Sequence, residues 1–185
     1  MSSTQSVKAL FLDRDGVINV DNGYVFERQN FEFIPGIFDL GRAAIRKGYK
    51  IFVITNQSGI ARGKYTEQDF FLMTEWMNQE FVKEDVIISQ VYFCPHHPEY
   101  SSVEDKNCAC RKPKPGLLLK ASREHDLDLS QSIMVGDKMT DMQAAQAAGV
   151  RVRVLLSSTL SKLEIDSALV LHESVQSLGE IVHFL

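Results

Sequence analysis

Apolar segments of strand length alternate with helical stretches along most of this 185-residue chain. The expected strands are residues 7–12, 50–55, 89–93, 132–135 and 152–155, and the expected helices are residues 37–47, 66–83, 116–125 and 140–148. Neighbouring parallel strands need a crossover connection, which is usually a helix. The alternation therefore predicts an α/β fold with a mostly parallel sheet and helices on both faces. Residues 168–171 and 174–183 are expected to form a final strand and helix.

Length and composition indicate one packed domain over residues 1–185. Hydrophobic residues make up 44% of the chain, and 20 Lys and Arg against 24 Asp and Glu give a net charge of −4. With no stripe of Lys and Arg, a nucleic-acid-binding protein is not expected. The apolar run before Asp13 is too short for a signal peptide or a membrane span. We expect a cytoplasmic protein without a membrane partner, and a monomer is the default.

Residues 94–115 break the alternation, because they have neither helical nor strand periodicity and contain four prolines and all three cysteines. A loop of this length inside a compact domain needs something to order it. Cys94, Cys108 and Cys110 with a nearby histidine would suit tetrahedral Zn²⁺. Spacing alone does not choose between His96 and His97. Free surface thiols are the simplest alternative; a disulfide between Cys108 and Cys110 would be strained.

An acidic pair ends the first expected strand. Asp13 and Asp15 are two residues apart and are followed by Gly16, so strand geometry places both carboxylates on the same side of the chain. Ligands of open parallel sheets bind at the carboxyl ends of the strands. Two negative charges there favour a hard divalent cation with oxygen ligands. An exposed acidic turn would give the same residues.

Polar residues also follow other expected strands. A hydroxyl and an amide come from Thr55 and Asn56, with Gln57 and Ser58 directly after them, and Asp137 follows a later strand. Arg111 and Lys112 lie just before a helix and could neutralise a phosphate. Carboxylates, oxyanion donors and a cation are what phosphoryl transfer requires.

The segments D-R-D-G, T-N-Q-S-G, R-K-P and G-D-K-x-x-D, in this order, resemble the four motifs of the haloacid-dehalogenase-like (HAD-like) phosphohydrolases. Within that superfamily the chain closely resembles the D,D-heptose 1,7-bisphosphate phosphatases, through D-R-D-G-V-I-N-V-D-N-G-Y-V, T-N-Q-S-G-I-A-R-G, C-P-H-H-P and C-x-C-R-K-P-x-P-G. The resemblance runs from about residue 8 to residue 155. It implies a Rossmann-like, HAD-like fold without a large cap domain, and a zinc-binding loop inserted at residues 94–115.

The resemblance also implies catalytic roles. Asp13 would be the nucleophile that accepts the phosphoryl group, and Asp15 would be the general acid and base. Asp13, the backbone carbonyl of Asp15, and Asp137 would hold Mg²⁺. Thr55, the N–H of Asn56, and Lys112 would bind the transferring phosphoryl group.

Further residues are assigned by the same resemblance. Arg111 would help to recognise the substrate, and His96 rather than His97 would complete the zinc site with Cys94, Cys108 and Cys110. The remaining substrate-binding residues would be Asp21, Asn22, Gly23, Tyr24, Gln57, Ser58 and Lys138. Because Lys138 follows Asp137 where many superfamily members carry paired acids, we expect Asp141 to act without touching Mg²⁺. The zinc is expected to order the loop that delivers Arg111 and Lys112.

The resemblance implies removal of the 7-phosphate from D-glycero-D-manno-heptose 1,7-bisphosphate, a small-molecule sugar bisphosphate on the way to lipopolysaccharide heptose. Histidinol-phosphate phosphatase is an alternative, because that family shares the four motifs and a similar zinc loop. A phosphorylatable receiver module is an alternative of another class, since it also uses an aspartate, an acidic pair, a Thr and a Lys on a parallel sheet. The sequence does not reveal which anomer is preferred.

Overall fold

One parallel sheet organises the computed structural model, which describes residues 6–157 and 173–185. Its strands lie in the order β3-β2-β1-β4-β5-β6, and each neighbouring pair is parallel. The strand bounds are β1 Lys8–Leu12, β2 Tyr49–Asn56, β3 Ile88–Cys94, β4 Ile133–Gly136, β5 Val152–Leu156 and β6 Glu173–Val175. Connections leave β1 and β4 in opposite directions, which opens a crevice at their carboxyl ends.

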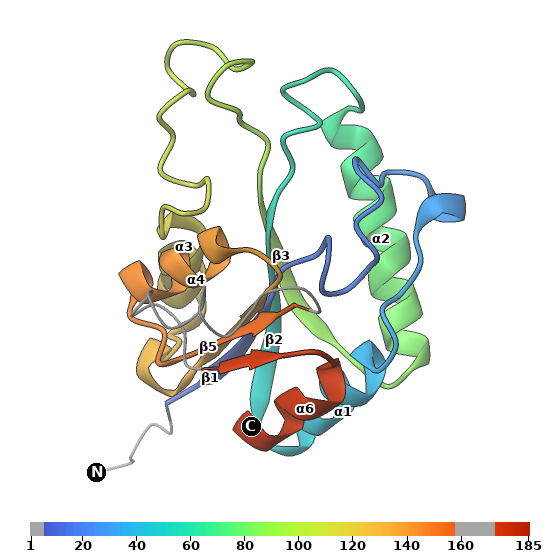
Figure 1. Ribbon diagram of the computed structural model, residues 1–185, viewed down its shortest axis with the longest axis vertical. Helices are drawn as coiled ribbons and strands as arrows, with labels where there is room; N and C mark the ends of the chain where they lie inside the picture. The colour runs from blue at the N-terminus through green and yellow to red at the C-terminus, as the bar shows by residue number, and fades with distance from the viewer. Residues whose placement is uncertain (1–5, 158–172) are drawn as a thin grey trace.

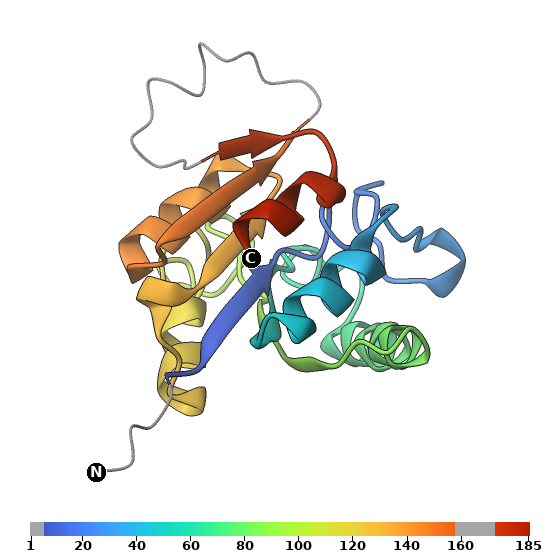
Figure 2. The same ribbon diagram turned by 90° about the horizontal axis from the view of Figure 1, so that it is seen from below.

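Helices cover both faces of this sheet, as the sequence predicts (Figures 1 and 2). One face packs against α1 (Ile37–Arg46), α2 (Glu67–Lys83) and α6 (Leu178–Ile181), and the other against α3 (Gly116–His125) and α4 (Met139–Ala148). Short 3₁₀ helices are η1 (Arg28–Asn30), η2 (Leu129–Gln131) and η3 (Val182–Phe184). The expected α/β fold with a Rossmann-like strand order is therefore confirmed.

Alternation along β1 supplies both halves of the core. Leu10 and Leu12 are buried in the cluster under α1 and α2, whereas Ala9 and Phe11 are buried in the cluster under α3 and α4. Successive side chains of a strand point to opposite faces, so an all-apolar strand can be buried on both sides. The acidic residues that follow β1 are thereby held at the edge of a rigid sheet.

Most element boundaries lie within about two residues of the expected ones, but the C-terminal expectation was partly wrong. Residues 174–183 were expected to be one helix, whereas Ser174 and Val175 belong to β6, which pairs with β5. Pairing with β5 is a non-local interaction that local periodicity does not report. The helix begins only after Ser177, whose side chain forms a capping box with Glu180. The strand expected at residues 168–171 lies outside the described residues.

Two loops rise from the carboxyl end of the sheet side by side (Figure 1). One follows β2 and the other, residues 95–115, follows β3 and contains no helix or strand, as expected. Backbone hydrogen bonds from Gln57 N to Cys94 O, 2.8 Å, and from Ala61 N to Pro95 O, 3.2 Å, join them. The β1–α1 connection, residues 13–36, contains η1 but no separate cap domain.

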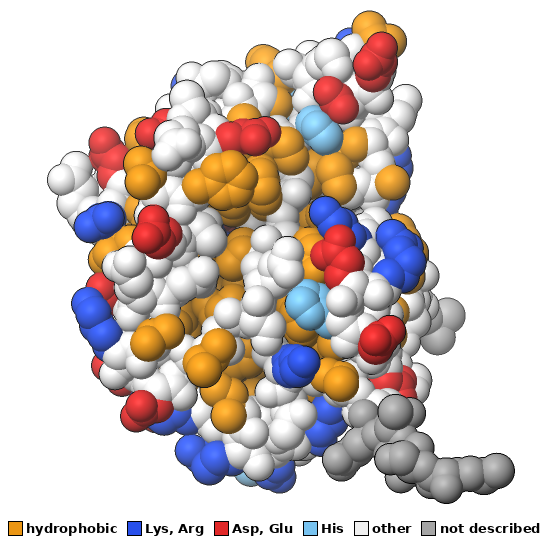
Figure 3. Space-filling model, turned by 180° about the vertical axis from the view of Figure 1, so that it is seen from behind, with side chains coloured by type: hydrophobic (Ala, Val, Ile, Leu, Met, Phe, Trp, Pro, Cys, Tyr) orange, Lys and Arg blue, Asp and Glu red, His pale blue; other side chains and the backbone are white. Residues whose placement is uncertain are grey.

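Charged side chains are spread over the rear face of the molecule. Lys and Arg alternate there with Asp, Glu and hydrophobic side chains among the described residues (Figure 3). Within the described part of the chain, no helix combines the length and the apolar composition that crossing a bilayer requires.

Candidate active site

A pocket of about 230 Å³ lies at the carboxyl edge of the sheet. Most of the residues that the sequence assigns to the site line it: Asp13, Asp15, Asp21, Gly23, Tyr24, Thr55, Asn56, Gln57, Ser58, Lys112 and Lys138. Gly59, Tyr65, Thr140 and Asp141 complete the lining. Asn22, Arg111 and Asp137 are not among the lining residues. Segments far apart in the sequence therefore converge on one cavity.

The Lys112 side chain occupies the floor of the site and is only 3% exposed. Its Nζ lies 3.0 Å from Asp13 Oδ1 and 2.7 Å from Asp141 Oδ1, and it donates to the carbonyl of Ile54 at 2.7 Å. Burial opposes the charged ammonium, but the two carboxylates outweigh it and hold the pKa of Lys112 above its ordinary value. The site thus contains a buried, fixed cation beside Asp13.

Asn56 holds the backbone of Lys112. The Asn56 Oδ1 accepts from Lys112 N, and Asn56 Nδ2 donates to Lys112 O, each at 3.1 Å. The Asn56 side chain thereby joins β2 to the loop that carries Lys112. Its backbone N–H remains the group proposed for binding.

Asp13 lies at the end of β1 and is 6% exposed. Burial, together with the charges of Asp141, Asp137 and Asp15, raises its pKa to about 7, although Lys112 acts in the opposite direction. One ammonium therefore faces several carboxylates, which leaves an excess of negative charge at the bottom of the pocket.

Carboxylate oxygens of Asp13, Asp137 and Asp141 lie within 4.8 Å of one another, close enough to share a cation. Asp141 is already engaged, since Oδ1 meets Lys112 Nζ and Oδ2 accepts from Lys138 N at 3.1 Å. Asp137 Oδ1 is buried and has no hydrogen-bond partner among the described residues. Buried polar atoms are normally satisfied, so this oxygen fits a metal ligand. The donors are all oxygens, which suits Mg²⁺.

Gly16 allows Asp137 to approach Asp13. Its φ is +90°, and a Cβ at this position would collide with the Asp137 carboxylate. Only glycine adopts such a φ without strain. The glycine after the acidic pair is therefore required by the close approach of Asp137 as well as by the turn.

Asp15 is held by three side chains. Arg14 donates from Nη2 to Oδ1 at 2.9 Å, Asn19 donates from Nδ2 to Oδ1 at 3.1 Å, and Gln57 donates from Nε2 to Oδ2 at 3.0 Å. Arg14 is 1% exposed and also donates to the carbonyl of Val25. Arg14 and Asn19 were not assigned to the site from the sequence. The first lies between two aspartates, where it resembles an ordinary turn residue.

Gln57 links Asp15 to Thr55. Its Nε2 also donates to Thr55 Oγ1 at 2.8 Å, and its Oε1 accepts from the hydroxyl of Tyr65 at 2.5 Å. Burial raises the pKa of Tyr65 to about 12. Tyr65 was missed in the sequence, because nothing in the spacing relates it to the motif at Thr55.

Lys138 closes one side of the pocket. Its Nζ lies 3.0 Å from Asp21 Oδ2 and 3.3 Å from Asp137 Oδ2. Burial alone would raise the pKa of Asp21, but the hydrogen bonds from Lys138 and from Gly23 N hold that pKa below its ordinary value. Asn22 is exposed, and the lining is supplied instead by its neighbours Asp21, Gly23 and Tyr24.

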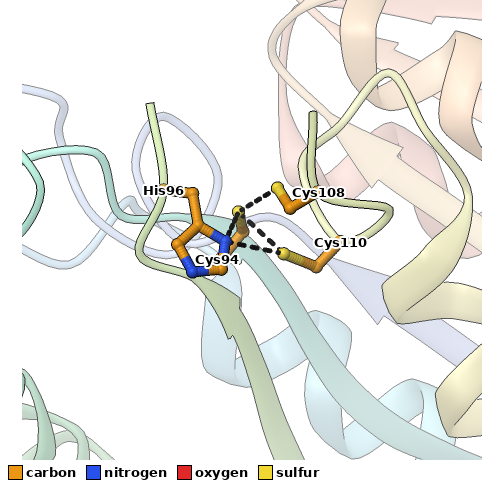
Figure 4. Close-up of side chains that lie close together, drawn as sticks. All are labelled: Cys94, His96, Cys108 and Cys110. Carbon is orange, nitrogen blue, oxygen red and sulfur yellow. Dashed lines mark hydrogen bonds between the residues drawn. The ribbon is translucent and has the colours of Figure 1, made fainter. Parts of the chain in front are cut away.

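Cys94, His96, Cys108 and Cys110 point toward a common centre (Figure 4). The Sγ of Cys94 lies 3.0 Å from that of Cys110 and 3.6 Å from that of Cys108. His96 Nδ1 lies 3.4 Å from Cys110 Sγ. All three cysteines are free thiols. Three sulfurs and one imidazole nitrogen form the donor set of a closed tetrahedral Zn²⁺ site.

The two histidines of this loop have different surroundings. The other ring nitrogen of His96, Nε2, faces Asp105 Oδ1 at 3.4 Å, an arrangement that orients metal-bound imidazoles. His97 instead contacts Arg62 Nη2 at 2.8 Å. Arg111 donates from Nη1 to the carbonyl of His96 at 3.0 Å. The geometry thus favours His96 over His97 and uses Arg111 to brace the loop.

Known proteins match both the sequence and this geometry. Residues 109–178 match the HAD-hydrolase-like family. The chain is 53% identical over 153 residues to the D-glycero-β-D-manno-heptose-1,7-bisphosphate 7-phosphatase of Escherichia coli (strain K12), over 82% of this chain and 80% of that one. It is 45% identical over 178 residues to the protein of that name in Vibrio cholerae serotype O1, over 96% of this chain and 95% of the other. The chain belongs to this phosphatase family.

A solved structure agrees with the assignment. The D,D-heptose 1,7-bisphosphate phosphatase from B. bronchiseptica, complexed with magnesium and phosphate, has a TM-score of 0.82 and 27% identity, covering 96% of this chain and 97% of that one. The family inferred from the four motifs is confirmed, and with it a phosphatase of the HAD-like superfamily, whose members use Mg²⁺.

Proposed function

We propose that the protein hydrolyses the 7-phosphate of D-glycero-β-D-manno-heptose 1,7-bisphosphate, releasing heptose 1-phosphate and inorganic phosphate. The reaction type is inferred from the surroundings of Asp13. Its Oδ1 lies 3.0 Å from the buried Lys112 ammonium, and the unpartnered oxygen of Asp137 belongs to the same carboxylate cluster. The substrate and its β anomer are supported by the names of the relatives.

In the first half-reaction an Asp13 carboxylate oxygen attacks phosphorus in line. A bond forms between this oxygen and phosphorus while the bond from phosphorus to the sugar oxygen breaks. Asp15 gives its proton to the departing oxygen, which leaves as the 7-hydroxyl of the sugar. The product on the enzyme is an aspartyl phosphate.

In the second half-reaction Asp15, now a carboxylate, takes a proton from water as that water attacks phosphorus. The bond between phosphorus and the Asp13 oxygen breaks, which restores the carboxylate and releases inorganic phosphate. Water is therefore the only reactant needed besides the substrate: its hydroxyl group ends on phosphate, and its proton restores the acid form of Asp15. Arg14, Asn19 and Gln57 hold Asp15 in place for both steps.

Charge on the transferring phosphoryl oxygens is met by Lys112, the Thr55 hydroxyl and the Asn56 N–H. Such fixed donors lower the barrier because they need no reorganisation during the reaction. Phosphate-monoester hydrolysis is among the slowest uncatalysed reactions, and enzymes accelerate it by up to about 10²¹-fold. Several charge-stabilising groups in one site are therefore expected.

Asp13, Asp137 and the carbonyl of Asp15 would hold Mg²⁺. When bound, the ion would neutralise the carboxylates and polarise the phosphoryl group. Asp141 would act on Lys112 instead, because both of its oxygens already have partners.

Recognition of the sugar would fall to the polar residues at the pocket mouth: Asp21, Asn22, Gly23, Tyr24, Gln57, Ser58, Arg111 and Lys138. Asn22 and Arg111 lie outside the pocket lining, so their contribution would require substrate that extends beyond it. An exposed Lys138 ammonium suits a second phosphate group.

We propose that Zn²⁺ bound by Cys94, His96, Cys108 and Cys110 is structural. Cys110 directly precedes Arg111 and Lys112, so a fixed cluster would fix the segment that carries the buried ammonium. Thiolate ligands are compatible with a reducing cytoplasm, where we place the protein.

We expect the protein to be a monomer. Size-exclusion chromatography with light scattering would check this.

The substrate assignment is tested by comparing kcat/KM for the β and α anomers of heptose bisphosphate and for histidinol phosphate, with Mg²⁺ present. The β anomer is expected to give the highest value. A preference for histidinol phosphate would overturn the substrate. The absence of turnover with any phosphomonoester would revive the receiver alternative, which the names of the relatives do not favour.

A further inference from the structure

A chain of hydrogen bonds with one fixed direction begins at Tyr65 and ends at Asp15. The Tyr65 hydroxyl meets Gln57 Oε1 at 2.5 Å, and Gln57 Nε2 meets Asp15 Oδ2 at 3.0 Å. A carboxylate only accepts hydrogen bonds, so the NH₂ end of the Gln57 amide must face Asp15. The carbonyl end then faces Tyr65, whose hydroxyl must donate.

The same amide sets the direction of the Thr55 hydroxyl. Gln57 Nε2 also lies 2.8 Å from Thr55 Oγ1, which accepts the second N–H of the amide. The hydrogen of the Thr55 hydroxyl is then free to point toward the phosphoryl group. One orientation of Gln57 therefore serves both the proposed acid and the proposed phosphoryl donor.

The Tyr65 ring is fixed before any substrate binds. It is 7% exposed and stacks on Phe26 with ring centroids 5.2 Å apart. Its edge rests against Gly59, where a Cβ would collide with the ring. A glycine in the loop after β2 thus makes room for a tyrosine that orients a glutamine of the same loop.

We propose that Tyr65 is a positioning residue for this phosphatase, acting through the Gln57 amide to hold Asp15 in the orientation for proton transfer to the leaving sugar oxygen. The inference rests on the proposed function, in which Asp15 is the general acid. Without the Tyr65 hydroxyl, the Gln57 carbonyl loses its donor in a buried place, and the hydrogen bond that anchors the far end of the amide behind Asp15 is lost.

Tyr65→Phe tests this by leaving-group dependence. An alkyl sugar oxygen needs a proton as it leaves, whereas the nitrophenolate of p-nitrophenyl phosphate does not. We expect kcat/KM to fall about tenfold for heptose bisphosphate and less than about threefold for p-nitrophenyl phosphate, since general acid catalysis is worth ~10²–10⁴ when complete. The quantity compared is the ratio of kcat/KM for heptose bisphosphate to kcat/KM for p-nitrophenyl phosphate. A change at Thr55 would lower both values alike, so it would not change this ratio.

Tyr92→Phe is the matched control. Tyr92 is also buried, and its hydroxyl donates to Glu124 at 2.6 Å, away from the pocket. We expect its kcat/KM values to equal those of the wild type. Thermal unfolding of each variant checks that the fold is kept.

Gln57→Leu provides a second route if Tyr65→Phe does not fold, because it also removes the buried carbonyl that Tyr65→Phe would leave without a donor, so the double variant is expected to fold. Gln57→Leu should lower the same ratio, and adding Tyr65→Phe to it should lower the ratio no further, because residues that act in one chain are not additive. Equal losses for both substrates, or no loss, in Tyr65→Phe or in Gln57→Leu would overturn the inference.

The outcome is separable from failure of the proposed function. If the wild-type protein hydrolyses histidinol phosphate but not heptose bisphosphate, the substrate is wrong and the ratio is measured with histidinol phosphate instead. A wild-type protein that hydrolyses no phosphomonoester would overturn both the proposed function and the role of Tyr65.

Discussion

Lys112 Nζ lies 2.7 Å from Asp141 Oδ1, and both side chains are almost completely buried. This ion pair fixes the ammonium that faces Asp13 and removes Asp141 from the set of free metal ligands. From the sequence, Asp141 is expected not to touch the metal because Lys138, rather than a second acid, follows Asp137. The contacts provide a physical reason, because both oxygens of Asp141 already have partners.

Asp141→Asn should lower kcat/KM about 10- to 100-fold, because a hydrogen bond to a charged group is worth about 1.5–3 kcal/mol and Lys112 would lose one of its carboxylates. Asp69→Asn is a suitable control. Both aspartates accept a backbone N–H at a helix start, but Asp69 is only partly buried and does not line the pocket. Steady-state kinetics that give Asp141→Asn wild-type activity would contradict the proposed role.

Gly16→Ala should weaken activation by Mg²⁺ more than it weakens substrate binding, because the added methyl group would displace the Asp137 carboxylate. Gly63→Ala is the control, because it introduces backbone strain without such a collision. Gly63 also has a positive φ, +65°, but a methyl group added there would meet no other atom within 4 Å. The measurement is the Mg²⁺ concentration for half-maximal activity. An equal shift in both variants would show that strain, not displacement of Asp137, is responsible.

Arg14→Lys should lower kcat/KM at least about tenfold and destabilise the fold by roughly 3 kcal/mol. A lysine lacks the planar fork by which Nε and Nη2 of Arg14 together hold Asp15 while Nη2 also reaches the carbonyl of Val25, and its loss leaves a buried ion pair incomplete. Arg42→Lys, at a partly exposed arginine that also contacts two carboxylates, should leave the free energy of unfolding nearly unchanged. Urea unfolding and kinetics measure both effects. Similar stability for the two variants would contradict the account of Arg14.

Removing zinc should abolish most of the phosphatase activity while the Mg²⁺ activation constant of the remaining activity stays the same. The reason is that the proposed zinc site would fix the segment that carries Lys112, whereas the proposed Mg²⁺ ligands directly follow β1 and β4. Zinc content, measured by elemental analysis, should fall in step with activity, and added zinc should restore both. Full activity in protein that contains no zinc would reject a structural role for the metal.

The sequence was sufficient for the sheet and for the convergence of the motifs. Apolar periodicity located the strands, and parallel strands necessarily bring residues such as Asp13 and Asp137 to one edge. It was insufficient for β6, because Ser174 and Val175 are strand only through pairing with β5. Local patterns carry no information about such distant partners.

The supporting residues were harder to predict than the reacting ones. Arg14 and Tyr65 contact other side chains of the pocket, Asp15 and Gln57, so no spacing rule relates them to the chemistry. Arg111 donates from its guanidinium to the carbonyl of His96, a side-chain direction that depends on the folded loop, and its contact with substrate stays a prediction. The contact between Asp105 and His96 also depends on how the loop folds, so it could not be predicted from the sequence.

The central claim is that Asp13 removes the phosphate at position 7 of the sugar. It is tested most directly by following heptose 1β,7-bisphosphate with ³¹P nuclear magnetic resonance in the presence of Mg²⁺. With the wild-type protein, the 7-phosphate signal should be replaced by that of inorganic phosphate while the 1-phosphate signal persists, and with Asp13→Asn neither signal should change. Loss of the 1-phosphate, or undiminished hydrolysis by Asp13→Asn, would contradict the account.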